Sequence, residues 1–382
     1  MKHDNPIPGL GIRFQPADFV YVYENHGAGG VGRDLYTAVL QNIAFVNESE
    51  TKITLDSAVL DASREGAVIQ SQRIGKDELV NTARQFHAYQ KQGLLETYDF
   101  QFQTRRYLKN IKFTSDTTLM PGHAIVVTRQ TMLFQGLPDT IKVTSKGHTP
   151  HGDVVSSENK LKVVNHKSKN EYIFPVRGRW LVAGAPSLHS HHRWGILEEF
   201  ALDLAKMGQG GLSHSDNGTK LAQFYAYGEP IYAIGDGLVV STRGDMEESD
   251  TNLQQPEESA EVYFERMLEY QQALLAKGFS FALGNHIVIQ HAHDEYSRYV
   301  HLQHSSVRVQ IGDRVSHGQQ IANLGHSGNS TEPHLHFDVA DSPDLAYSRS
   351  IPLTFTNITL WPDDDGTVRH LHLGQVVVAG EC

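Results

Sequence analysis

The sequence predicts a mostly β protein with two domains, a β-sandwich-like domain over residues 1–170 and an antiparallel β-sheet domain over residues 171–382. Three observations favour this fold class. A chain of 382 residues is long for one hydrophobic core and sufficient for two. Most of it consists of short runs in which apolar and polar residues alternate, as in half-buried strands. Helical spacing of apolar residues interrupts this pattern once in each half of the chain.

The N-terminal domain is predicted from the alternating runs between about Asp18 and Val164, which polar or glycine-containing turns separate. This arrangement is typical of antiparallel strands in a sandwich. Residues 77–93 differ, because their apolar residues recur at helical spacing and few of them are β-branched. We expect a helix inserted between strands there. Examples of the strand-like runs are Phe19–Tyr23, Thr51–Leu55 and His123–Val127.

The C-terminal domain is predicted from a second β-rich region that begins at about Tyr172. Residues 245–278 interrupt it with an acidic segment followed by an amphipathic helix over residues 260–277. We expect a helical insertion between two strands, either a surface helix that only decorates the domain or a lid over its site. The apolar residues at helical spacing are Val262, Met267, Leu268, Leu274 and Leu275.

Composition excludes several classes of protein and of site. The net charge of −11 disfavours nucleic-acid binding, which needs a basic surface. The only cysteine, Cys382, excludes a disulfide framework and a cysteine-based zinc site. No segment has the apolar length of a membrane span, and no signal peptide is recognisable at Met1–Pro8. Either the protein stays in the cytoplasm or the chain begins after a removed export signal.

A histidine pair in a predicted strand is the first chemical signal. In the run from Ser330 to Phe337, His334 and His336 lie two residues apart and therefore share one face. Leu335 and Phe337 face the core on the other side. Two imidazoles on one face can hold a metal or divide the work of ligation and proton transfer. The simpler alternative is a pair of partly exposed surface histidines.

Three further segments surround this pair. The run 296–302 contains Tyr299 and His301, and we expect Tyr299 to share the face of His301. In the run 307–315 we expect a strand followed by a turn at Gly312-Asp313. The glycines Gly325 and Gly328 then permit a tight turn that leads the chain back, which places His301 near the histidine pair.

An aspartate in a buried strand is the last signal. Asp203 alternates with leucines in the run 200–204, where a carboxylate is costly unless it is paired or bound to a cation. A backbone or arginine partner is the simpler alternative to a metal. His191 and His192 precede it along the chain.

In this order the motifs resemble the lysostaphin/LytM-type peptidases, zinc endopeptidases that cut the peptide cross-links of bacterial peptidoglycan. The resemblance spans about residues 180–355 and is closest over 284–338, with Tyr-x-His-Leu, Gly-Asp-x-Val-x-x-Gly-Gln and Pro-His-Leu-His-Phe. It implies a peptide or peptidoglycan substrate and a location in the cell envelope or outside the cell. It also implies zinc held by three ligands and two histidines for proton transfer. The implied ligands are His192, Asp203 and His336, and the implied catalytic residues are His301 and His334.

Some alternatives stay open at this point. The spacing before Asp203 leaves His191 and His192 both as possible ligands. Some relatives keep this fold as non-catalytic binding or activating modules of the envelope, typically after losing metal ligands. Two histidines and a carboxylate also suit iron(II) in oxygenases, although the glycine-rich turns argue against that class.

Overall fold

The computed structural model describes residues 9–25, 35–188, 190–208, 210–362 and 370–380. Strands dominate the chain, so the predicted mostly β fold is confirmed. The chain divides into two compact units, which consist of Met1–His166 with Trp194–Ile196 and of Lys167–Arg193 with Leu197–Cys382. Met1–Pro8, which were predicted to lack a signal peptide, and Cys382 lie outside the described residues.

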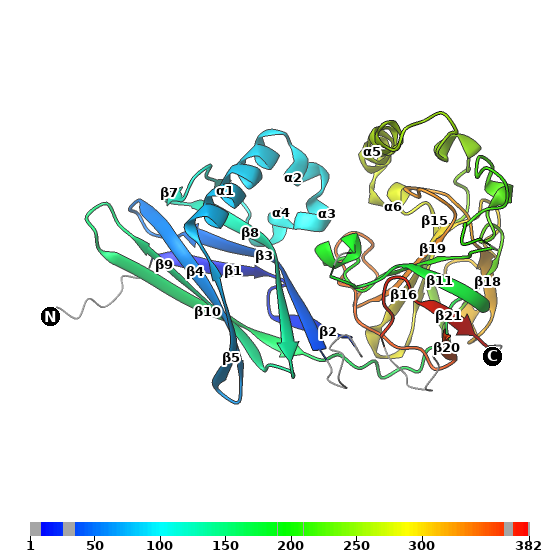
Figure 1. Ribbon diagram of the computed structural model, residues 1–382, viewed down its shortest axis with the longest axis horizontal. Coiled ribbons are helices and arrows are strands. Elements are labelled where there is room, and N and C mark those ends of the chain that lie inside the picture. Colours follow the sequence, from blue (N-terminus) through cyan, green and yellow to red (C-terminus); the bar gives the residue numbers. More distant parts are fainter. Residues whose placement is uncertain (1–8, 26–34, 189, 209, 363–369, 381–382) are drawn as a thin grey trace. The chain divides into compact units, whose positions relative to one another are not determined.

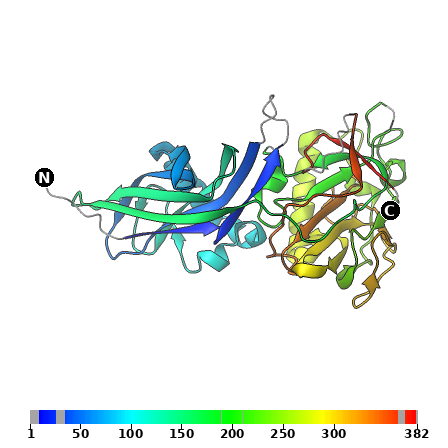
Figure 2. The same cartoon turned by 90° about the horizontal axis from the view of Figure 1, so that it is seen from below.

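The first unit is built on one large, curled sheet (Figures 1 and 2). Its described strands are hydrogen-bonded in the order β5-β4-β9-β10-β2-β3-β8-β6, with β1 paired to β3 and β7 to β4. The pairs β10–β2 and β6–β8 are parallel, and the other pairs are antiparallel as expected. The strands are β1 (Leu10–Gln15), β2 (Phe19–Asn25), β3 (Leu35–Asn47), β4 (Ile53–Arg64), β5 (Ala67–Ile74), β6 (Lys112–Phe113), β7 (Thr118–Leu119), β8 (His123–Gln135), β9 (Thr140–His148) and β10 (Val154–Val164).

Strand β3 is buried along most of its length because both faces of the sheet are covered there. Ile43 and Phe45 join the core that the curled sheet encloses. Ala44 lies on the other face and packs in a second cluster with Phe86 of α1. The helix predicted over 77–93 is α1, and three short helices after it were not predicted. These helices are α1 (Lys76–Lys91), α2 (Leu94–Thr97), α3 (Asp99–Phe102) and α4 (Thr104–Tyr107).

The second unit contains a sheet whose described strands follow the order β17-β14-β15-β16-β19-β12-β11-β21-β20. Every pair in this order is antiparallel, and β13 pairs with β18 in a separate small sheet. The strands are β11 (Gly178–Gly184), β12 (Leu202–Ala205), β13 (Pro230–Tyr232), β14 (Gly237–Arg243), β15 (Asn285–Gln290), β16 (Tyr296–Leu302), β17 (Arg314–Val315), β18 (Gln320–Asn323), β19 (Leu335–Ala340), β20 (Ile358–Trp361) and β21 (Val376–Ala379).

One predicted strand is largely missing. The strand expected before the turn at Gly312-Asp313 is absent, because residues 307–310 have irregular backbone, and only the short β17 follows the turn. The predicted turn is present, and Gly312 in it has a φ of +95°, in the left-handed region where glycine is favoured. This segment therefore reaches the sheet only at its edge, as the neighbour of β14.

The insertion between β14 and β15 is helical, as expected. Its main helix is α5 (Ala260–Lys277), followed by the short α6 (Phe279–Ala282). The Ser259 hydroxyl caps α5 by accepting a hydrogen bond from the Val262 amide at 3.3 Å. Met267 and Leu274 are buried, but Val262 is 54% exposed, so the predicted apolar face is buried only in part. No helix in the described ranges is long and apolar enough to cross a membrane.

A buried ion pair joins the central strands of this sheet. Arg298 on β16 is bonded to Asp338 on β19 through Nε and Nη2 of its guanidinium, with Nε 2.7 Å from Oδ1. The same guanidinium donates to the Leu197 carbonyl at 2.6 Å and to the Ser348 hydroxyl at 2.7 Å. The pair therefore fixes two strands and the segment that leads into β12.

Replacement of Arg298 by Met should lower the free energy of unfolding by about 3–5 kcal/mol, because the buried Asp338 carboxylate loses its cation. Urea unfolding measures this loss. Arg314→Met, on the exposed surface of β17, is the matched control and should change stability by less than about 0.5 kcal/mol. Equal stability of the two variants would show that Arg298 does not hold the sheet together.

Candidate metal centre and active site

One face of the second sheet gathers the ionisable residues predicted from the sequence. Asp203 on β12 lies directly opposite His336 on β19, so both side chains project from the same face. Leu335 and Phe337 are fully buried on the other face, as the alternation predicts. The Nδ1 of His336 is 2.9 Å from Oδ1 of Asp203.

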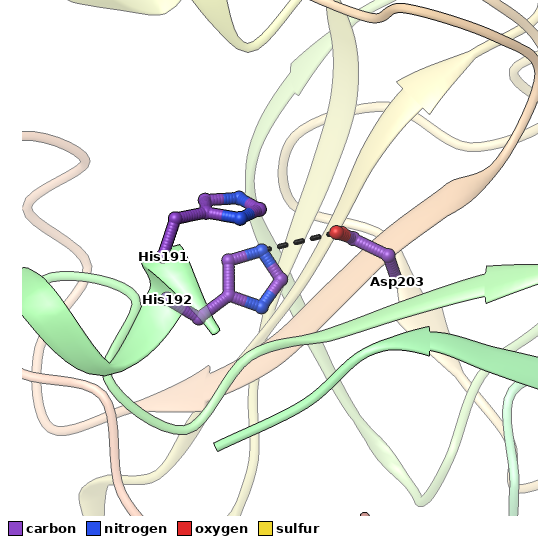
Figure 3. Close-up of side chains that lie close together, drawn as sticks. All are labelled: His191, His192 and Asp203. Carbon is purple, nitrogen blue, oxygen red and sulfur yellow. Dashed lines mark ion pairs between the residues drawn. The ribbon is translucent and has the colours of Figure 1, made fainter. Parts of the chain in front are cut away.

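His192 reaches the same carboxylate from the short 3-10 helix His191–Trp194. Its Nε2 is 3.1 Å from Oδ2 of Asp203, and its Nδ1 is 3.1 Å from the Ala201 carbonyl oxygen. Because a carbonyl only accepts hydrogen bonds, Nδ1 carries a proton and Nε2 faces the carboxylate. Figure 3 shows the His192 ring turned toward Asp203, with the ring of His191 beside it.

Two groups of side chains in the described part of the chain have donor atoms close enough to share a metal ion. His191, His192 and Asp203 form one group, and His192, Glu198 and His336 form the other, with ligand atoms within 4.8 Å of one another in each. His192 belongs to both groups and is buried, whereas His191 is exposed. Glu198 was not predicted, because a glutamate in an irregular segment has no periodicity to single it out.

The two remaining predicted residues, His301 and His334, lie beside this group. Their ring centres are 4.9 Å apart, and the rings of His301 and His336 are 6.1 Å apart. The Nδ1 of His301 is 2.8 Å from the Ser327 carbonyl, and that of His334 is 2.7 Å from the Glu332 carbonyl.

These carbonyls hold the Nδ1 of both rings as a hydrogen-bond donor, because a carbonyl oxygen only accepts. The Nε2 of His334 lies 3.5 Å from Oδ1 of Asp203.

The face of His301 is set by an irregularity in β16. The pairing of β15 with β16 shifts register between Asn285 and Ile287, and His301 has a φ of +62°. A bulge of this kind turns a side chain to the other face, and such strained residues often occur at functional sites. The prediction that Tyr299 shares the face of His301 is therefore wrong. Tyr299 is buried with its ring 5.2 Å from that of Phe337, on the core side.

The electrostatics around Asp203 favour a bound cation. Burial alone would raise the pKa of this carboxyl, but the imidazoles of His192 and His334 outweigh it and hold the pKa well below its usual range. Burial also opposes protonation of His192, yet the Asp203 carboxylate raises the pKa of His192 to about 9. A positive charge is thus stabilised between these two side chains. Burial and the neighbouring His334 and His336 lower the pKa of His301, which is neutral at pH 7.

Sequence reasoning missed two side chains that lie next to His334, those of His326 and Ser330. His326 lies in a glycine-containing turn, where a surface position is the usual expectation, but it is 1% exposed. Its Nδ1 lies 3.0 Å from the Ser330 hydroxyl, and that hydroxyl donates to the Glu332 carbonyl at 2.8 Å. Burial, followed by the nearby His334, lowers the pKa of His326 to about 4. The spacing of one histidine in a glycine-rich turn gives no sign of this burial.

The structure therefore brings all five residues singled out in the sequence into one cluster. Oxygens of Asp203 lie within 3.1 Å of ring nitrogens of His192 and His336, and the rings of His301 and His334 lie next to them. Such an arrangement can bind a divalent cation and move protons at neutral pH.

Residues 271–345 match Peptidase family M23. The matched range contains His301, His334 and His336, whereas His192 and Asp203 precede it. "Peptidoglycan DD-endopeptidase ShyA" of Vibrio cholerae is 32% identical over 139 residues, which are 36% of this chain and 23% of that protein. An "Uncharacterized metalloprotease" of Buchnera aphidicola is 41% identical over 112 residues, 29% of this chain and 20% of that protein.

The aligned stretches thus cover about a fifth of the length of these two relatives. Among solved structures, the catalytic domain of lysostaphin from Staphylococcus simulans is 19% identical, with 46% of this chain and 88% of that chain covered. The TM-score of this comparison is 0.25. The family match and the sequence relatives confirm the resemblance noted above, and the second unit contains a domain of peptidase family M23 at residues 271–345.

Proposed function

We propose that the second unit is a zinc-dependent endopeptidase that hydrolyses peptide bonds in the cross-links of peptidoglycan. The observation that carries this proposal is the Asp203 carboxylate, which lies within 3.1 Å of nitrogen atoms of both His192 and His336. The family match and the printed name of the Vibrio cholerae relative support the choice of reaction and substrate. A location in the cell envelope or outside the cell follows from that substrate.

The donor set fits zinc. His192 would bind through Nε2 and His336 through Nδ1, because these are the atoms that face Asp203. The Ala201 carbonyl holds the other nitrogen of His192, which is the usual way in which a ligating imidazole is oriented. When bound, zinc would supply a water with a pKa lowered to about 7 and would polarise the substrate carbonyl.

The neighbouring imidazoles supply the proton transfer. The Nδ1 atoms of His301 and His334 donate to the carbonyls of Ser327 and Glu332, which leaves the Nε2 of each ring for proton exchange. One of them accepts the proton of the attacking water. The other, once protonated, stabilises the oxyanion of the tetrahedral intermediate or protonates the departing amine.

Digestion of purified peptidoglycan of different cross-link types, followed by mass spectrometry of the products, tests the reaction. The zinc-loaded protein should release cleaved cross-links, and protein stripped by a chelator should not until zinc is restored. Metal analysis of freshly purified protein separates the alternatives. About one equivalent of zinc supports the peptidase. Iron would indicate oxygenase chemistry, and a protein without metal or cleavage would be a binding or activating module.

Ala substitution at Asp203 or His336 should abolish both zinc binding and cleavage, because each change removes one of only three proposed ligands. Elemental analysis after dialysis measures the zinc. The paired variants His191→Ala and His192→Ala decide between adjacent histidines, and only His192→Ala should lose zinc. Full occupancy in Asp203→Ala or His336→Ala would overturn the ligand assignment.

His301→Ala and His334→Ala should keep zinc but lower kcat by about 100- to 10,000-fold, as expected for general acid–base groups. Steady-state kinetics on a confirmed cleavable peptide and zinc analysis of the same preparation measure the two effects. His304→Ala is the matched control, because this exposed histidine follows β16 and does not reach the cluster. Near wild-type turnover in either test variant would exclude that residue from proton transfer.

A further inference from the structure

The insertion between β14 and β15 is bonded to the loop that carries His334. The Asn285 side chain bonds the backbone N–H and carbonyl of Met246, both at 2.8 Å. The Glu248 carboxylate accepts hydrogen bonds from the amides of His326 and His304, the latter at 2.9 Å. The Tyr263 hydroxyl on α5 donates to the Thr331 carbonyl at 2.7 Å. The insertion is therefore hydrogen-bonded to the segments that flank the proposed site.

Between the insertion and this loop lies a cavity of about 400 Å³. This size is within the range of roughly 300–1,000 Å³ that is usual for small-ligand pockets. Tyr263 and Gln255 line it from the insertion, Phe224 from the segment before β13, and Thr331 and Glu332 from the loop.

Glu332 has two roles, because its carbonyl orients His334 at 2.7 Å and its side chain lines the cavity. The cavity therefore adjoins the loop residue whose carbonyl orients His334.

The charge of the cavity is negative. Two carboxylates line it, and no lysine or arginine does so among the described residues. Glu258 is already neutralised, because Arg266 bonds both of its oxygens at 2.8 and 2.9 Å. Glu332 accepts a hydrogen bond from the Ser213 hydroxyl at 2.8 Å and forms no ion pair with a described residue. One half-buried carboxylate thus faces the cavity without a cation.

We propose that this cavity is a substrate subsite that binds a side chain ending in a primary ammonium group, with Glu332 as its counter-ion. The amide of Gln255 and the rings of Tyr263 and Phe224 surround the stem of such a side chain. This assignment rests on the proposed function, because it places a peptide across His334. It gives the insertion a role in substrate selection.

Calorimetric binding to the zinc-loaded protein tests the subsite. The probes are N-acetylated tetrapeptide amides Ala-X-Ala-Ala, in which X is lysine, Nε-acetyllysine or norleucine, each in the L and D forms. One lysine peptide should bind about tenfold or more tightly than its norleucine and acetyllysine counterparts, as expected for a hydrogen bond between charged groups. Glu332→Gln should remove this preference and leave the affinity for norleucine unchanged. Glu265→Gln, an exposed carboxylate on α5, is the matched control and should keep the preference.

Equal binding of the lysine and norleucine peptides to the wild-type protein would overturn the subsite, as would a preference that survives in Glu332→Gln. Thermal unfolding of both variants checks that each is folded. The readout is independent of cleavage. A protein that prefers lysine through Glu332 but digests no peptidoglycan would refute the proposed function and leave the subsite intact.

Discussion

The carboxylate of Asp203 is the contact on which the site of the second unit depends. It lies within 3.5 Å of ring nitrogens of His192, His334 and His336, which come from a 3-10 helix, a loop and a strand. A half-buried carboxylate is costly unless it is paired, and these imidazoles are the partners that surround it. The backbone accommodates this closeness at Gly184 on β11. A Cβ there would lie 2.3 Å from Oδ2 of Asp203, which leaves room only for glycine.

The cluster is kept in order by groups outside it. Carbonyl oxygens of Ala201, Ser327 and Glu332 each hold the Nδ1 of one histidine, so the nitrogens that face the centre are decided by the course of three loops. Arg298 acts indirectly on the segment that carries Ala201, because it joins two central strands to the Leu197 carbonyl ahead of β12. The backbone of these loops thereby decides which nitrogen of each imidazole faces the centre, and the sheet holds the ends of the loops in place.

Sequence reasoning succeeded where strand alternation applies. The faces of His336 and Asp203 follow from the side-chain period of two, and their pairing needs only that β12 and β19 be neighbours. It failed for His301 and Tyr299, because a bulge reverses the alternation and a bulge has no reliable pattern in a single sequence. Burial of His326 was also missed, since it depends on tertiary contacts.

The same limit applies to larger elements. The helix α5 was predicted with its ends in the right place, but Leu268 is 39% exposed, so apolar spacing alone did not identify the buried side of the helix. In the first unit the parallel pairing of β10 with β2 is a long-range contact that the local pattern does not contain. Periodicity therefore predicted the longer elements and one face of the site, and tertiary contacts decided the rest.

The contacts of the insertion bear on its two predicted roles, surface decoration or lid. A decorative helix would touch only the back of the domain, whereas Tyr263 and Glu248 bond the backbone of the loop before His334. A lid would open freely, but these bonds tie the insertion to both ends of that loop. Any change in the position of α5 would therefore move the Thr331 carbonyl and, one residue further, the carbonyl of Glu332 that orients His334. The backbone of Thr331 and Glu332 thus couples substrate contact in the cavity to the position of His334, a proposed proton-transfer residue.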